Sequence, residues 1–202
     1  MKNLYSEDAF TGLEAAIVLI AFVVVAAVFS YVVLGAGFFT SQTAQSTVHT
    51  GVSQASSSME LVGNVYGVKD ATNNYLDYVN TTVSLTAGGT PIDLSAMVVS
   101  YNDNNGGHNA NLTYEGVAQE GSACTNSLAG TAPQSWCISD KINNITTGAM
   151  LDNGAQMIIT VGVPTTATPN TQLTINFQPA VGAVLPIART IPGGLTAVQP
   201  LY

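Results

Sequence analysis

The hydrophobic positions of this chain form one uninterrupted block near the N-terminus. From Ala15 to Phe39 the sequence carries no charged side chain over 25 residues. A helix of that length, at about 1.5 Å per residue, measures roughly 37 Å and can cross a bilayer. A secretory signal has a shorter apolar stretch of about 7 to 15 residues, followed by a cleavage site of small residues. We therefore expect the mature chain to keep this segment.

The segment that follows is rich in Ser, Thr and Gln, yet its apolar residues recur every three or four positions. They are Ala44, Val48, Val52, Ala55, Met59 and Val62. This spacing predicts one face of an α-helix, so that residues 13–62 form a single rod of roughly 75 Å. Hydroxyl residues and Gly51 are middling or poor helix formers, which implies that partner helices hold the outer half. The alternative is a flexible Ser/Thr stalk.

Beyond residue 62 the period changes to two. Val79–Leu85 and Leu173–Phe177 alternate apolar and polar side chains, which predicts half-buried strands. Further strand candidates are Ile92–Tyr101, Ala110–Ala118 and Gln156–Val163, and Pro186 places the last strand at a sheet edge. Turn residues such as Gly88-Gly89, Asn153-Gly154 and Gly193-Gly194 separate these segments. The predicted fold class is α+β, with a long N-terminal helix followed by an antiparallel β-sandwich over residues 63–202.

The apolar block is preceded by a short polar leader, residues 1–12, which ends in Gly12. A peptidase that cuts at the cytoplasmic end of a hydrophobic segment would remove this leader and leave the whole helix on the mature chain. The alternative is an uncleaved single-pass membrane anchor with a small cytoplasmic tail.

Charge and composition exclude several classes of function. Charged residues make up 8% of the chain, and 4 Lys and Arg against 12 Asp and Glu give a net charge of −8, so the chain has no basic surface for nucleic acid. Two Cys and two His do not form a zinc-site pattern. His49 and His108 have no nearby nucleophile and carboxylate in a recognisable order, so we expect neither an enzyme nor a cofactor.

The turn at residues 102–107 places oxygen ligands loosely in the order of a calcium loop. The closing acid is missing, because Tyr114 stands at the twelfth position counted from Asp103. The default interpretation is a polar turn, and a bound metal ion is the alternative.

These features together resemble the archaellins, the subunits of the archaeal flagellum, over the whole chain. The N-terminal match is Leu13-Glu14-Ala15-Ala16-Ile17-Val18-Leu19-Ile20-Ala21. Three later segments are similar to family patterns: Ala87-Gly88-Gly89-Thr90-Pro91-Ile92-Asp93-Leu94, Leu151-Asp152-Asn153-Gly154, and the pair Pro179–Ala183 and Arg189–Pro192. The chain departs from the family in having Thr11, where a basic residue usually precedes the cleavage Gly.

The resemblance implies a structural subunit of an extracellular filament that is rotated for swimming, with an immunoglobulin-like outer domain. It implies a membrane-inserted precursor cut between Gly12 and Leu13 by a prepilin-type peptidase, an assembly ATPase, and a homopolymer that can include other archaellins. The apolar helix would form the polymer core, through Ile17, Val18, Ile20, Phe22, Val24, Val25, Val28, Phe29 and Val32. The alternatives are an adhesive pilus subunit of the type IV family and a membrane-anchored surface binding protein.

An extracellular location changes how two further features are interpreted. Cys124 and Cys137 are the only cysteines, and disulfides persist outside the cell, so we predict that they are bonded. Three sequons, at Asn80, Asn111 and Asn144, predict at least one N-glycan.

Overall fold

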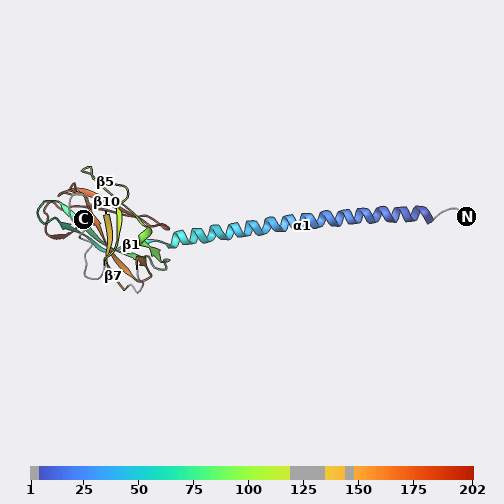
Figure 1. Ribbon diagram of the computed structural model, residues 1–202, viewed down its shortest axis with the longest axis horizontal. Helices are drawn as coiled ribbons and strands as arrows, with labels where there is room; N and C mark the ends of the chain where they lie inside the picture. The colour runs from blue at the N-terminus through green and yellow to red at the C-terminus, as the bar shows by residue number, and fades with distance from the viewer. Residues whose placement is uncertain (1–4, 119–134, 144–147) are drawn as a thin grey trace. The chain divides into compact units, whose positions relative to one another are not determined.

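A computed structural model describes residues 5–118, 135–143 and 148–202 of the chain (Figure 1). The chain divides into two compact units, Met1–Thr50 and Gly51–Tyr202. The described residues of the first unit form a helix, and the second unit contains the described β-strands together with the end of that helix.

The helix α1 spans Tyr5–Ser56, so it begins inside the predicted leader and ends six residues before Val62. The prediction that it continues to Val62 was wrong, because Met59 and Val62 belong to the first strand, β1 (Met59–Lys69). Met59 pairs with Leu85 and is buried in the core of the second unit. Strand pairing and burial there outweigh the helical spacing of the apolar residues. The β-domain accordingly starts at Met59 and not at residue 63.

The described strands of the β-domain form three sheets. The first has six strands in the order β12 (Val198–Pro200), β1, β2 (Leu76–Leu85), β9 (Gln156–Gly162), β7 (Ser135–Ile142) and β6 (Thr113–Val117). The second has four, in the order β11 (Leu185–Thr190), β10 (Gln172–Gln178), β4 (Val98–Asp103) and β5 (His108–Asn109). The third pairs β3 (Ile92–Asp93) with β8 (Met150–Leu151). Neighbouring strands are antiparallel except β6 and β7, which are parallel.

The two larger sheets share one hydrophobic core. Val79 and Ile159 contribute to it from the six-stranded sheet, and Val99 and Ile175 contribute from the four-stranded sheet. The predicted alternation in β2 is confirmed from Val79 to Val83, since Val79, Thr81 and Val83 are buried and Asn80 and Thr82 are half-buried. It ends at Ser84, which is buried because its hydroxyl donates a hydrogen bond to the Ala155 carbonyl oxygen. A helix followed by a mostly antiparallel β-sandwich is therefore the fold of this chain.

Turns shorten two of the predicted strands, while β9 ends one residue earlier than predicted. The segment Ile92–Tyr101 is interrupted by a 3-10 turn, Leu94–Ala96, because the Asp93 side chain caps it by accepting a hydrogen bond from the Ser95 N–H. The segment Ala110–Ala118 begins its strand only at Thr113, because the Asn109 side chain accepts from the Asn111 N–H and forms a turn. Pro186 lies on β11 at a sheet edge as expected, although β12 follows it.

Within the second unit, the residues that follow α1 are held in a tight socket. Ser57 is buried, and its hydroxyl shares a 2.6 Å hydrogen bond with that of Thr90. Gly182 has a φ of +121°, and a Cβ atom there would overlap the Ser57 carbonyl oxygen. A Cβ atom at Gly89 would lie 3.1 Å from the Ser56 carbonyl oxygen. Two of the family-like segments found in the sequence thus supply glycines that lie close to adjacent serines, Gly182 to Ser57 and Gly89 to Ser56.

The socket predicts that Gly182→Ala destabilises the β-domain far more than a glycine substitution in open space. Gly154 is the matched control, because its φ is +79° but nothing lies within 4 Å of its position. Left-handed strain alone costs roughly 1–2 kcal/mol, which lowers the melting temperature by about 3–6 °C in a domain of this size. We expect Gly154→Ala to show that decrease and Gly182→Ala at least twice as much, measured by Trp136 fluorescence in the detergent-solubilised chain. Equal decreases would contradict the socket.

Candidate functional site

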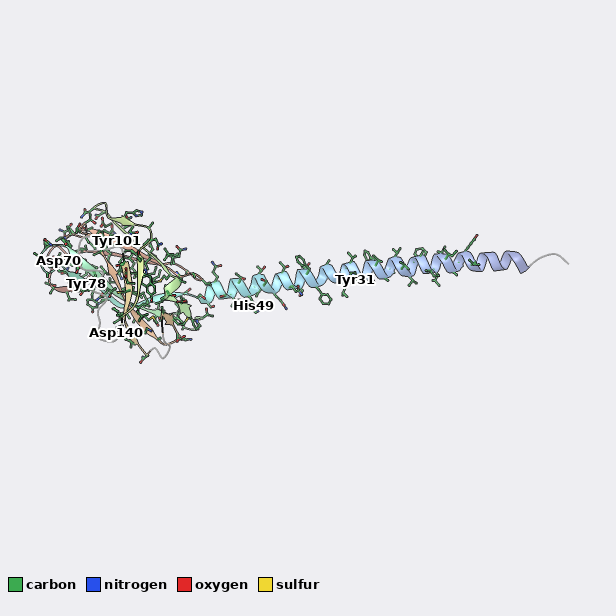
Figure 2. All side chains as sticks on the ribbon, viewed as in Figure 1. Tyr31, His49, Asp70, Tyr78, Tyr101 and Asp140 are labelled. Atoms are coloured by element: carbon green, nitrogen blue, oxygen red, sulfur yellow. The ribbon has the colours of Figure 1, made fainter. Side chains whose placement is uncertain are left out.

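The candidate site is the apolar surface of α1. The nine residues predicted to form a polymer core are between 52% and 70% exposed: Ile17, Val18, Ile20, Phe22, Val24, Val25, Val28, Phe29 and Val32. Side chains project from the helix on all sides, Tyr31 and His49 among them (Figure 2). Such a surface is stable in water only if another molecule or a membrane covers it.

The apolar surface is wider than the nine predicted residues. Leu19, Val23, Val33, Phe38 and Phe39 are equally exposed, so apolar side chains surround the helix and do not form a single stripe. These additional residues could have been identified from the sequence, because they lie in the same unbroken apolar block. From Gly12 to Gln54 the helix is long and apolar enough to cross a membrane, by length and composition. A helix that is hydrophobic all round requires apolar surroundings on every side.

Small residues create openings in this surface. Gly37 lies in a shallow groove whose walls include Phe29, Val33 and Phe38. A Cβ atom at Gly35 or Gly37 would meet nothing within 4 Å in this chain. The fold of the chain therefore gives no reason for glycine at these two positions. Close approach of a neighbouring helix does give one.

The outer half of α1 carries hydroxyl groups that are already satisfied. Thr40, Thr43, Thr47 and Thr50 each donate a 2.9 Å hydrogen bond to the carbonyl oxygen four residues earlier. A hydroxyl with this partner can be buried without leaving an unpaired donor. Val48 and Val52 are more than 60% exposed between these threonines. This half of the helix can therefore pack against apolar neighbours as well.

The predicted leader boundary lies inside the helix. Gly12 and Leu13 are both exposed, and α1 continues through them without a break. The structure does not bring them together with any other candidate residue. Their role as a cleavage site remains a prediction.

The turn at residues 102–107 is organised around the buried carboxylate of Asp103. Its Oδ1 accepts hydrogen bonds of 2.8 Å from the N–H groups of Asn105 and Gly107. Its Oδ2 accepts from the hydroxyls of Tyr101, at 2.8 Å, and Thr166. Four protein donors thus occupy the carboxylate, and among the described residues no three His, Cys, Asp or Glu side chains cluster in a way that could hold a metal ion. The geometry fits the polar turn.

The pKa values at this turn follow from the same contacts. Burial alone would raise the pKa of Asp103, but the four hydrogen bonds outweigh burial and hold it below its ordinary value of 3.8. The pKa of Tyr101 is raised, first by burial and then by its hydrogen bond to the Asp103 carboxylate. At neutral pH the Asp103 carboxylate is therefore a charged acceptor and the Tyr101 hydroxyl a neutral donor. A hydrogen bond between such groups is stronger than one between two neutral groups.

The remaining candidate residues are the predicted disulfide cysteines, the three sequon asparagines and the two histidines. Cys137 is buried on β7, whereas Cys124 lies outside the described residues, so the disulfide between them remains a prediction. Asn111 is exposed, while Asn80 is half-buried in a central strand, where its Oδ1 accepts a 2.8 Å hydrogen bond from Thr160. Asn144 also lies outside the described residues. His49 and His108 lie in different units.

A folded β-sandwich and an uncovered apolar helix together define a subunit built to be buried by other molecules through its N-terminal segment. Comparison with known proteins agrees. Residues 9–189 match the archaeal-type flagellin family. Probable flagellin 1 of Archaeoglobus fulgidus is 40% identical over 213 aligned residues, covering 100% of this chain and 98% of that protein. The 24 kDa flagellin of Methanospirillum hungatei is 93% identical over 30 residues, 15% of this chain and 94% of that sequence.

Structural comparison leads to the same family. The archaeal flagellum of Methanospirillum hungatei strain JF1 superposes with a TM-score of 0.68 at 30% sequence identity, covering 94% of this chain and 98% of that chain. This chain belongs to the archaeal-type flagellin family. It is a structural subunit of the archaeal flagellum, and the family match favours this function over the adhesive pilus subunit and the anchored binding protein.

The Asp103 turn predicts a pH-dependent contribution to stability. Because the folded pKa lies below the unfolded value, the stabilisation is present above about pH 4 and is lost as pH falls through the folded pKa. Asp103→Asn should cost about 2–3 kcal/mol at pH 7, since the amide nitrogen faces donors that the carboxylate accepted. We expect the difference in unfolding free energy between the wild type and Asp103→Asn to narrow below pH 4. Thermal unfolding of both proteins from pH 7 to pH 3 measures it. Asp140→Asn, which changes an exposed carboxylate, is the control. A difference in unfolding free energy between the wild type and Asp103→Asn that does not depend on pH would contradict this assignment.

Proposed function

We propose that the chain polymerises through α1, so that helices from many copies form the core of the filament and the β-domains form its outer wall. The observation that carries the proposal is the set of seventeen large apolar side chains exposed between Leu13 and Phe39. Packed helices from other copies would cover them on every side. The wide distribution of these side chains around the helix requires several neighbours and not a single partner.

Small and self-satisfied residues support tight helix packing in such a core. Gly35 and Gly37 would let a neighbouring backbone approach, and the threonine hydroxyls of the outer half would need no partner from another copy. In a core of this kind the stabilisation comes from close packing, interhelical contacts and the exclusion of water.

Before assembly, the same helix is suited to a membrane. We propose that the precursor is held in the membrane by α1, that a prepilin-type peptidase removes the leader after Gly12, and that an ATPase-driven machine assembles the filament outside the cell. Transfer from lipid to a helical core gains little hydrophobic free energy, because lipid tails are as apolar as Val and Leu. An external source of work therefore fits the chemistry of the segment.

We propose that the outer wall is glycosylated at Asn111. Its side chain is exposed in a turn, and Thr113, the third residue of its sequon, is exposed as well. Asn80 is a poorer acceptor, because it lies in the middle of a sheet and its side chain is hydrogen-bonded to Thr160.

The variant Val24→Asp tests the polymer core. Val24 is 55% exposed in the middle of the apolar block. A carboxylate there costs several kcal/mol in a dry helical core and about 2.5–3.5 kcal/mol in a bilayer. We expect a membrane-bound precursor with a folded, protease-resistant β-domain, no surface filaments, and cells that do not swim when this is the only subunit.

The matched control is Val184→Asp, which places the same charge on the β-domain at 47% exposure. It should leave filaments and swimming in place, as seen by negative-stain microscopy and motility in soft agar. Cells that swim normally on Val24→Asp alone would refute a polymer core made of α1.

Intact-mass analysis of sheared filaments tests the leader. We expect a mature chain that begins at Leu13, twelve residues shorter than the precursor. The family match begins at residue 9, within the proposed leader. The measured mass also distinguishes a cut after Gly12 from a cut further upstream. A mass that includes any of residues 9–12, or the whole leader, would overturn the proposed cut.

Glycopeptide mapping tests the outer wall. The peptide that contains Asn111 should carry a glycan, and the peptide that contains Asn80 should be bare, because the half-buried amide of Asn80 is engaged in the sheet. Asn111→Gln should remove the modification without changing the melting temperature. An unmodified Asn111 in native filaments would reject the assignment.

A further inference from the structure

A patch of exposed and half-buried tyrosines and aliphatic residues lies on β1, β2 and β12 of the six-stranded sheet and on the C-terminal residue just beyond β12. It comprises Tyr66, Val68, Tyr78, Val198, Pro200 and Tyr202, and we call it the C-terminal tyrosine patch. Tyr66, Val198 and Tyr202 are 43%, 59% and 76% exposed. None of the six is charged.

The register of the strands makes the patch continuous. Val198 pairs with Val68, which pairs with Tyr78, while Pro200 pairs with Tyr66. Paired residues have Cβ atoms about 5 Å apart on the same face of a sheet. The residues between them, Gly67 on β1 and Gln199 on β12, are buried on the opposite face of the sheet. Figure 2 marks Tyr78 on the β-domain.

The patch is held rigidly. The Leu201 N–H donates to the Val65 carbonyl, and Leu201 itself is buried. Tyr202 exchanges backbone hydrogen bonds with Thr190 of β11, which ties the C-terminus to the four-stranded sheet. A preformed surface of this kind loses little conformational entropy when it binds.

We infer that the C-terminal tyrosine patch binds the β-domain of a second copy of this chain in the filament. The inference rests on the proposed polymerisation, which places copies of the domain at high local concentration. Residues 59–202 carry nine acidic and three basic side chains, so copies repel one another over most of their surface. The patch is an uncharged surface through which two copies can meet without burying a charge.

Its size fits a contact that forms only within the polymer. Side chains of this kind offer about 300–500 Å² per copy, well below the roughly 800 Å² per partner of a stable soluble complex. The patch therefore does not dimerise the chain alone. In a helical filament every contact is head-to-tail, so the patch meets a different surface of its neighbour and not a second patch.

Hydroxyl-radical footprinting tests the inference on filaments made only of this chain, with the detergent-solubilised subunit as the reference. We expect oxidation of Tyr66 and Tyr202 to fall at least five-fold on polymerisation. Tyr101, which is 1% exposed, should be unreactive in both states and serves as the internal control. Unchanged oxidation of Tyr66 and Tyr202 in intact filaments would overturn the inference and leave polymerisation through α1 untouched.

A double variant gives a second, independent measurement. Tyr66→Ser with Val198→Ser should still form filaments, because α1 is intact, but these should dissociate at a lower temperature than those of the wild type. Trp136 fluorescence of the solubilised variant shows whether its β-domain remains folded. Filaments with an unchanged dissociation temperature would overturn the inference, whereas a wild-type chain that forms no filaments would refute the proposed function itself.

Discussion

The exposure of the apolar helix to water is the constraint on which the rest of this molecule depends. Each of the seventeen large apolar side chains between Leu13 and Phe39 is worth about 1 kcal/mol or more once the area already covered by the helix is discounted, and together they amount to tens of kcal/mol. The helix must therefore be covered either by a membrane or by other helices. Release of a single subunit into water is prohibitive, and a filament held in this way is effectively irreversible.

The β-domain is free of that constraint. Its apolar side chains are buried within the domain itself, without a partner. They include Val79 and Ile159 on one sheet and Val99 and Ile175 on the other. It carries most of the acidic surface, and its stability depends on internal features such as the Asp103 carboxylate and the socket at Ser57. The sequence thus separates two tasks. In the proposed filament, the helix provides cohesion between copies, and the domain provides the outer wall.

Periodicity and composition predicted most of this division, and the failures have physical causes. The uncharged block revealed the helix, because no other element tolerates 25 such residues, and period-two alternation revealed β2, β9 and β10. The helix end was predicted wrongly because Met59 and Val62 continue the helical spacing by coincidence. Their backbones pair with β2, and they therefore belong to a strand. Strands β7 and β12 were missed because charged and hydroxyl residues interrupt the apolar positions of Ser135–Ile142, and Val198–Pro200 is too short to show a period. Contacts between distant segments, such as Gly182 with Ser57, leave no local signal.

Electron cryo-microscopy of native filaments at side-chain resolution tests the central claim most directly. The account predicts that the helices lie side by side around the filament axis, and that the nine core residues, 52–70% exposed in the single chain, become nearly fully buried against other copies. The β-domains should lie outside them. Filaments in which these helices remain exposed to solvent, or in which the β-domains form the central core, would contradict it.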